Sequence, residues 1–419
     1  MTVRCRRAGY PLLLAVLGAA LGCAALAEDA PGRYAIKAGK IVTVTQGTID
    51  GGMVLVADGK IEAVGRATDV PIPEGYTVVD ASQSWLMPGM VEVHSHCGVQ
   101  GGLNDMVSQI NPGMLIGDGV DPEDRVAAAA LAAGITTIQT IPGSGTNHGG
   151  FGVAFKTAGA TKEDRIIRRV SIMKVTQAYN PERSGGDIGA TRMGMAWILR
   201  QHLNAAVLYN DAWTAYERGE TSVPPTRDLA MEPIRPVLRG ELPVLIHTYE
   251  TWGVLMSMGM FYEEYGLKAI ATHDGYGSWK AARTVARPGY NINIGPQVTD
   301  FYSGGDARFR SDTATFYEGG VRDLSVNTDS FGLGQALLAD KAAMAARFGM
   351  DDKAALELVT INAARAILLG ERLGSIEVGK DADLVVKRTS LLDPTTPVEM
   401  VFVNGRIAYR RDAEGGANE

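Results

Sequence analysis

The stretch Leu86-Met-Pro-Gly-Met-Val-Glu-Val-His94-Ser-His96 determines how the rest of the chain is interpreted. Its valines favour a strand that begins just after the Pro88-Gly89 pair. Residues two apart in a strand project to the same side, so His94 and His96 direct two imidazoles at one point. Such a pair can bind a divalent cation, although two histidines on a solvated strand face would give the same pattern. The choice depends on whether further ligands follow downstream.

The length and charge of the chain limit its architecture and its partners. At 419 residues it exceeds the usual span of a single core, so we expect a large domain together with a smaller one. With 46% hydrophobic and 21% charged residues, the composition is typical of globular proteins. The formal net charge is −7 and no basic cluster occurs, which argues against a nucleic-acid partner.

Residues 1–27 are expected to be a signal peptide rather than part of the fold. A segment with three arginines precedes an apolar run at 12–21 that is too short to span a membrane comfortably, and Ala25-Leu-Ala27 is a small-x-small cleavage site. We therefore expect an exported, periplasmic protein without a transmembrane helix in the mature chain. A lipid anchor on Cys23 is the alternative, because Leu21-Gly22-Cys23 partly resembles a bacterial lipobox.

Cleavage after Ala27 would leave 37 basic and 47 acidic residues and a single cysteine. An intrachain disulfide is then impossible, even in an oxidising compartment. That cysteine is Cys97, directly after the His94-x-His96 strand. We expect it to be a buried structural thiol.

The two ends of the mature chain share a β character. Residues 28–85 contain short strands joined by tight turns, and Asp58-Gly59 between two apolar runs is a strong hairpin signal. Residues 371–411 have the same character and their own Asn404-Gly405 turn. Neither segment has enough strands to close by itself, so we predict that both build one small β-sandwich domain. Residues 412–419 are expected to be a disordered tail.

The region between these ends, 86–370, alternates between strand and helix patterns. Candidate strands lie at 89–96, 134–141, 151–156, 169–176, 243–248, 267–272, 289–294 and 321–328, and candidate helices at 122–133, 191–217, 226–239, 249–265, 278–286 and 332–348. Only a Gly-rich loop at 142–150 joins the second strand to the third. Eight strands predict an α/β fold with a (β/α)8 TIM-like barrel. A doubly wound sheet would alternate too, but only a closed ring brings all the strand ends together.

Single potential ligands follow three later strands. His247 and His273 each end an apolar run, and Asp329 ends the last one, which is where barrel enzymes mount catalytic groups. Imidazoles and a carboxylate without thiolate suit Zn²⁺, and also Mn²⁺, Fe²⁺ or Co²⁺. We expect a zinc-dependent hydrolase, in which the metal lowers the pKa of a bound water to about 7. Asp329 would act as general base and then as general acid.

These motifs together resemble the metal-dependent amidohydrolase superfamily, in its imidazolonepropionase-like branch, which includes exported prolidase-like hydrolases. The resemblance covers about residues 34–411 and rests on Pro88-Gly89 before His94-x-His96, on His247 and His273, on Thr328-Asp329, on Thr360-Ile-Asn-Ala-Ala364 and on Gly374-Ser-Ile-Glu-Val-Gly-Lys-Asp-Ala-Asp-Leu-Val385. It implies hydrolysis of a C–N bond in an amide, a dipeptide or a cyclic amide, with one or two metal ions. Glu92 departs from the family pattern, in which an Asp usually stands two residues before the first ligand.

The same resemblance raises the question of a second metal. Binuclear members carry a carboxylated lysine on the fourth strand that bridges two ions. Lys174 is our candidate for that ligand, and Lys156 on the third strand competes with it. If neither serves, the site is mononuclear. A homo-oligomer is also possible within this family.

Three further residues are candidate contacts for a small-molecule or dipeptide substrate: His148 in the Gly-rich loop, Arg192 and Tyr276. His202 lies in a predicted helix and is expected at the surface. One alternative function is a mononuclear heterocycle deaminase with Glu250 as its proton shuttle. Another is a non-catalytic periplasmic binding protein on the same fold, although the complete ligand set argues against it.

Overall fold

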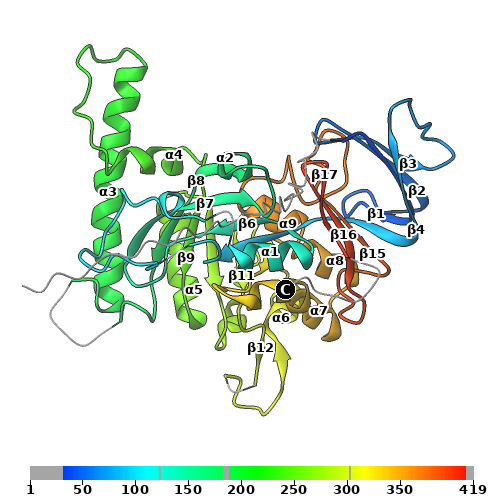
Figure 1. Cartoon of the computed structure of the whole chain (residues 1–419). Helices are drawn as coiled ribbons and strands as arrows, with labels where there is room; N and C mark the ends of the chain where they lie inside the picture. Colours follow the sequence, from blue (N-terminus) through cyan, green and yellow to red (C-terminus); the bar gives the residue numbers. More distant parts are fainter. Residues whose placement is uncertain (1–31, 100, 122–123, 183–187, 302, 412–419) are drawn as a thin grey trace, which may run out of the picture.

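The computed structural model describes residues 32–99, 101–121, 124–182, 188–301 and 303–411. Two sheets organise these residues: an eight-stranded barrel sheet and a seven-stranded sheet that we call the terminal sheet (Figure 1). The predicted signal peptide, 1–27, and the predicted tail, 412–419, lie outside the described residues. Within the described ranges, no helix combines the length and the apolar character needed to span a bilayer.

The terminal sheet is built from both ends of the chain. Its strands are β1 (Tyr34–Val42), β2 (Thr48–Ala57), β3 (Lys60–Arg66), β4 (Thr77–Pro88), β15 (Leu384–Lys387), β16 (Val398–Val403) and β17 (Arg406–Arg410). The antiparallel pairing of β15 with β4 joins the two ends, which lie side by side in blue and red in Figure 1. Asp58-Gly59 and Asn404-Gly405 form the expected hairpin turns with positive φ. These seven strands form a single sheet, in the order β17-β16-β15-β4-β1-β2-β3, so the predicted β-sandwich is not confirmed.

The barrel sheet contains eight strands close to the predicted positions. They are β5 (Met90–Ser95), β6 (Ile135–Thr140), β7 (His148–Lys156), β8 (Ile166–Thr176), β9 (Val244–His247), β10 (Ala269–His273), β11 (Asn291–Ile294) and β14 (Leu324–Val326), hydrogen bonded in that order. Just beyond the first and last strands, Asp329 N donates to His94 O at 3.2 Å and His96 N donates to Ser330 O at 2.9 Å. These two bonds bring the ring close to closure, which confirms a mixed α/β fold with a nearly closed barrel.

Strand β7 departs from the expected parallel pattern, because it runs antiparallel to both β6 and β8. Only residues 141–147 connect β6 to β7, whereas a parallel crossover needs about a dozen residues or more. The short connection therefore forces a hairpin. As a result, the carboxyl end of β7 lies at the mouth of the barrel opposite to the ends of the other strands.

The helices surround the barrel sheet (Figure 1). The longer ones are α1 (Arg125–Ala132), α3 (Arg192–Glu217), α5 (Glu250–Met258), which continues into the π-helix η3 (Gly259–Glu264), and α7 (Leu338–Arg347). Shorter elements are α2 (Lys162–Arg165), α4 (Arg235–Leu238), α6 (Asp312–Glu318), α8 (Asp352–Glu357), α9 (Ile361–Ala366), η1 (Ile116–Asp118), η2 (Glu232–Ile234), η4 (Ser278–Ala281), η5 (Leu333–Leu337) and the strand pair β12 (Thr299–Asp300) and β13 (Arg310–Ser311). The helix expected at 226–239 is reduced to η2 and α4, because Pro233 and Pro236 interrupt it.

Gly89 lies between the terminal sheet and the barrel. Its backbone N–H donates to Asp383 O at 2.9 Å, and a Cβ atom at this position would lie 2.2 Å from the Oγ1 atom of Thr136. Only glycine therefore allows the start of β5 to approach β6 so closely. This contact sets the position of the strand that carries His94 and His96.

Candidate metal centre

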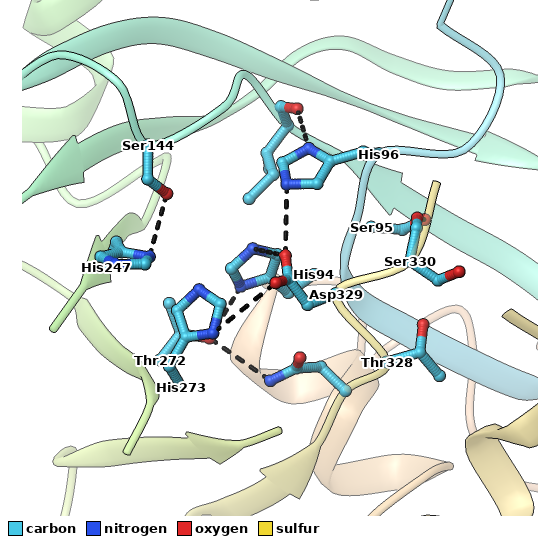
Figure 2. A network of polar contacts seen from close by, with 12 residues as sticks. His94, Ser95, His96, Ser144, His247, Thr272, His273, Thr328, Asp329 and Ser330 are labelled. Atoms are coloured by element: carbon cyan, nitrogen blue, oxygen red, sulfur yellow. Dashed lines mark hydrogen bonds and ion pairs between the residues drawn. The ribbon is translucent and has the colours of Figure 1, made fainter. Parts of the chain in front are cut away.

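The ends of four barrel strands bring the predicted ligands to one place (Figure 2). The Nε2 atoms of His94 and His96 lie 3.0 and 3.2 Å from the same carboxylate oxygen, Oδ1 of Asp329. His273 Nδ1 lies 3.9 Å from the other oxygen, Oδ2, and the ring centroid of His247 is 4.2 Å from that of His273. Among the described residues, His94, His273 and Asp329 form a group whose donor atoms all lie within 4.8 Å of one another.

Hydrogen bonding shows which nitrogen of His96 is free. Its Nδ1 atom lies 2.9 Å from the carbonyl oxygen of Ile141, which can only accept, so Nδ1 carries the proton. In the neutral imidazole, the Nε2 atom then carries a lone pair that faces Asp329 Oδ1. Two acceptors this close repel each other unless a cation or a proton lies between them.

The same reasoning applies to His94. Thr272 Oγ1 donates to Asn293 Oδ1 at 2.9 Å, so this hydroxyl accepts from His94 Nδ1 at 2.8 Å. Burial lowers the pKa of His94 well below its ordinary value, which keeps the imidazole neutral. Its Nε2 lone pair therefore also points at Asp329. The polar side chains behind the ligands thus fix the tautomer that a metal requires.

Other groups near this mouth are also buried without a hydrogen-bond partner among the described residues, among them His247 Nε2, His273 Nε2 and Lys174 Nζ. Ser144 Oγ lies 2.9 Å from His247 Nδ1, which leaves Nε2 as the free nitrogen. Burial lowers the pKa of His273 to about 4 and that of Lys174 to about 7. Unpaired buried polar atoms are rare in folded proteins, and the two free imidazole nitrogens in one place fit a bound cation.

Glu92 connects the strands that carry the first and the last ligand. Its Oε1 accepts from His94 N at 3.0 Å, and its Oε2 accepts from Thr328 N at 3.0 Å, Thr328 Oγ1 at 2.7 Å and Gln335 Nε2 at 3.0 Å. Complete burial raises the pKa of Glu92 to about 7 in spite of these donors. Sequence reasoning missed this role, because Thr328 is 236 residues away and only the fold brings it near.

The backbone turns sharply where the strands deliver these ligands. His273 and Asp329 have φ values of 79° and 48°, in the left-handed region that non-glycine residues seldom adopt. Glu250 and Tyr276, each three residues after a histidine of this group, have φ values of 61° and 54°. Strained residues of this kind cluster at functional sites, where the surrounding structure must hold them.

Lys156 lies elsewhere. It ends β7, and the antiparallel course of that strand carries it to the barrel mouth that faces the terminal sheet. There its Nζ pairs with Asp381 Oδ2 at 3.1 Å and with Asp383. The alternative that Lys156 is a metal ligand is therefore wrong, because the prediction assumed a parallel third strand.

Two histidines outside this group contact each other. His148 is the first residue of β7 rather than part of the loop, and it is completely buried, with its Nδ1 3.2 Å from His202 Nε2. This geometry leaves His148 no surface for the expected substrate contact. The expectation that His202 lies at the surface is wrong, since its side chain is buried and contacts His148 of β7.

Arg192 and Tyr276, the other predicted substrate contacts, lie on loops and helix ends at the ligand mouth. Arg192 pairs with Glu182 at 2.8 Å and with Glu250 at 3.4 Å. Glu250, the shuttle of the deaminase alternative, is thus held by an arginine. The ring of Tyr276 is half exposed and stacks on Tyr249, with their centroids 4.3 Å apart.

Sequence comparisons relate this chain to known amidohydrolases. The amidohydrolase family matches residues 305–408. Amidohydrolase tasK from Hapsidospora irregularis is 27% identical over 392 residues, which cover 85% of this chain and 40% of that protein. The match therefore spans about two fifths of the length of that relative. Imidazolonepropionase from Sphingopyxis alaskensis is 24% identical over 379 residues, which cover 85% of this chain and 90% of that protein.

Solved structures extend the similarity to three dimensions. An amidohydrolase from Thermotoga maritima superposes with a TM-score of 0.79 at 27% identity, over 90% of this chain and 100% of that one. A prolidase complexed with N-methylphosphonate-L-proline superposes with a TM-score of 0.56 at 15% identity, over 90% of this chain and 100% of that chain. At that identity the prolidase shows only that the fold is shared. The similarity covers both the barrel and the terminal sheet.

Proposed function

Because this chain belongs to the amidohydrolase superfamily, in its imidazolonepropionase-like branch, we propose that it is a metal-dependent hydrolase of an amide, a dipeptide or a cyclic amide. His94, His96, His247, His273 and Asp329 are the proposed ligands. The observation that carries the proposal is the opposition of the imidazole Nε2 atoms of His94 and His96 to Asp329 Oδ1, at 3.0 and 3.2 Å. When a ring is neutral, its Nε2 atom carries a lone pair that faces the carboxylate, and a cation between the two groups would be bound by both.

Zinc is the metal we propose, since imidazole and carboxylate ligands without thiolate suit it. When bound, it supplies a Lewis acid that lowers the pKa of water and polarises the scissile carbonyl. Asp329 lies with Oδ1 toward His94 and His96 and Oδ2 toward His273, so the second oxygen is the proposed proton acceptor. Asp329 takes one proton as water adds to the carbonyl carbon, and returns it to the nitrogen as the C–N bond breaks.

Lys174 is our candidate for a carboxylated lysine that bridges two ions. In the sheet, Lys174 lies opposite Leu245 of β9, and Leu245 is two residues before His247. The Nζ atom of Lys174 is completely buried and has no hydrogen-bond partner among the described residues. Metal analysis of the purified protein and of Lys174→Ala tests this assignment. Two equivalents of metal in the unchanged protein, falling to one or none in Lys174→Ala, would support it. One equivalent in both proteins means a mononuclear site.

The experiment that tests the function is a screen of dipeptides, N-acyl amino acids and lactams against Zn²⁺- and Mn²⁺-loaded protein. We expect cleavage of at least one class, and a loss of about 10²- to 10⁴-fold in kcat for Asp329→Asn, the usual contribution of a general base. Circular dichroism of the variant checks that it is folded. Equal rates for Asp329→Asn and the unchanged protein would refute the mechanism. Ammonia release from amino-heterocycles without amide cleavage would instead support a deaminase.

The proposal includes export, with residues 1–27 as the leader. It is supported by the three arginines, the apolar run and the Ala25-Leu-Ala27 site. Cell fractionation and N-terminal sequencing of the mature protein test it. An N-terminus at Glu28 in the periplasmic fraction is expected. A lipid-modified Cys23 in the membrane fraction would support the anchored form, and an intact N-terminus in the cytoplasm would overturn export.

A further inference from the structure

Three tyrosine rings stack in a row at the ligand mouth of the barrel. Tyr249 is the middle ring, with its centroid 5.4 Å from Tyr179 at an interplanar angle of 16° and 4.3 Å from Tyr276 at 29°. The two outer side chains remain open to solvent, with 65% of Tyr179 and 50% of Tyr276 exposed. We call these three residues the tyrosine stack. Each outer ring therefore has a face or an edge available for a ligand.

The tyrosine stack lies next to the candidate metal ligands. Tyr249 follows His247 by two residues, and Tyr276 follows His273 by three. The loop after β8, the Lys174 strand, supplies Tyr179. A fourth aromatic residue, Phe331, follows Asp329 by two, is 74% exposed, and has its ring centroid 6.4 Å from that of His96. Exposed aromatic rings thus flank the centre from both the β8–β10 side and the β14 side.

Polar contacts hold the stack in place. Arg192, at the start of α3, pairs with Glu182 at 2.8 Å and with Glu250 at 3.4 Å. The same Glu182 carboxylate accepts from Tyr179 N at 2.8 Å, and Thr251 Oγ1 donates to Gly277 O at 2.8 Å in the loop of Tyr276. The loops after β8, β9 and β10 are therefore linked to one another. Arg192 therefore helps to hold the stack, and its predicted contact with substrate stays a prediction.

The arrangement is costly for the isolated protein. Large exposed apolar groups that gather in one place usually mark a binding surface. In addition, Tyr179 and Tyr276 have φ values of 65° and 54°, a conformation that bulky residues rarely adopt. Strain of this kind persists where function maintains it. Stacked tyrosines offer flat, rigid surfaces that complement another aromatic ring.

We propose that the tyrosine stack and Phe331 form a specificity wall that selects amides with an aromatic ring next to the scissile C–N bond. This inference rests on the proposed function, since the metal centre defines where the scissile bond lies. The wall determines which substrate is held, while Asp329 and the histidines act on the amide.

Binding to a variant with strongly reduced turnover tests the wall separately from hydrolysis. In Zn²⁺-loaded Asp329→Asn, calorimetry measures the Kd of N-acetyl-L-phenylalaninamide and of N-acetyl-L-alaninamide. We expect the aromatic amide to bind about tenfold more tightly, the value of one good ring contact. Adding Tyr276→Ala should remove that preference, while Tyr276→Phe, which keeps the ring, should retain it. Equal Kd values for the two amides, or a preference that survives Tyr276→Ala, would overturn the inference.

Hydrolysis supplies a second, separable readout. The ratio of kcat/KM for glycyl-phenylalanine to that for glycyl-alanine should fall about tenfold in Tyr276→Ala. Tyr409→Ala, in strand β17 of the terminal sheet, is the matched control and should leave the ratio unchanged. If neither dipeptide is cleaved but the binding preference is found, dipeptide hydrolysis fails and the wall stands. If both are cleaved at equal rates, the wall fails and the proposed function stands.

Discussion

At the scale of single residues, Glu92 shows how a side chain that touches no substrate can determine the geometry of a centre. Its carboxylate accepts four hydrogen bonds, one from the backbone of His94 and three from Thr328 and Gln335. All of these partners are donors. An amide in place of the carboxylate would set an NH2 group against at least one of them.

We expect Glu92→Gln to lower the free energy of unfolding by about 1–3 kcal/mol, the cost of leaving a buried donor unpaired. It should also weaken metal retention, because His94 and the loop of Asp329 lose their common anchor. Urea unfolding and metal content after dialysis measure the two effects. The control is Glu241→Gln, an exposed carboxylate paired with Arg239, for which we expect a change within about 0.5 kcal/mol. Equal effects of the two substitutions would contradict this role of Glu92.

A second prediction at the scale of single residues concerns the reactivity of the Cys97 thiol. It is 1% exposed, as the sequence led us to expect of a structural thiol, and burial raises its pKa to about 12. In a chain that begins at residue 28 it is the single cysteine. We expect a thiol reagent such as DTNB to label the native protein slowly at neutral pH and the urea-unfolded protein at once, because thiolate and access are both required. Rapid stoichiometric labelling of the native protein would show that the thiol is accessible.

At the scale of elements, strand β7 explains both what the sequence predicts and where it fails. Alternating apolar runs locate all eight barrel strands, because burial of their side chains is a local property of the sequence. The apolar pattern does not indicate whether a strand runs parallel or antiparallel to its neighbours. That direction follows from the length of the connection, and the 141–147 loop was too short for a crossover. Lys156 was misplaced for this reason, whereas His94, His96, His247, His273 and Asp329 lie at the ends of parallel strands and meet at one mouth of the barrel, where their role as ligands stays a proposal.

The helices show a similar limit. Thr191–Glu217 was predicted to within a residue because Thr191 is a cap that accepts from Gly194 N. The tyrosine stack and the Glu92 contacts could not be predicted, since they join segments that only the closed barrel brings together. His202 was expected at the surface because it lies in a predicted helix. Its burial involves a contact with His148 of β7, 54 residues away in the chain, with the two ring centroids 5.2 Å apart.

Lys156 provides a prediction at the scale of elements. It is 1% exposed and pairs with two buried carboxylates, Asp381 and Asp383, which link β7 to the segment before β15. We expect Lys156→Met to lower the free energy of unfolding by about 3–5 kcal/mol, because buried Asp383 loses the Lys156 ammonium, whereas Asp381 keeps Lys60 at 2.6 Å and Arg372 at 2.9 Å. Lys60→Met is the matched control. It removes a half-exposed lysine from the same Asp381 and should cost only about 0–1 kcal/mol. Denaturant unfolding measures the free energy of unfolding of both variants. Equal losses would contradict the view that the buried Lys156 ion pairs stabilise the contact between β7 and the segment before β15.

At the scale of the whole molecule, the barrel and the terminal sheet depend on each other. The chain enters the barrel through Gly89, whose N–H binds Asp383 O in the C-terminal segment. β15 pairs with the last four residues of β4, from Leu384 opposite Pro88 to Lys387 opposite Trp85. The position of the first ligand strand is therefore set partly by residues that lie close to the other end of the chain.

This dependence predicts that residues 28–370 do not fold without 371–411, although they contain every proposed ligand. Removing the C-terminal segment deletes fully buried side chains such as Leu384, Val401 and Phe402. At about 1.5–3 kcal/mol for each, the loss of these three alone approaches the 5–15 kcal/mol that stabilises a typical domain. It also leaves Lys156 buried without a counter-ion and exposes the edge of β4. We expect 28–370 to be insoluble or to lack a cooperative thermal transition by circular dichroism. A chain of residues 28–411, which lacks only 412–419, should melt like 28–419. A soluble 28–370 that melts cooperatively at the same temperature and binds zinc would show that the barrel is an independent domain and that the terminal sheet does not position its ligands.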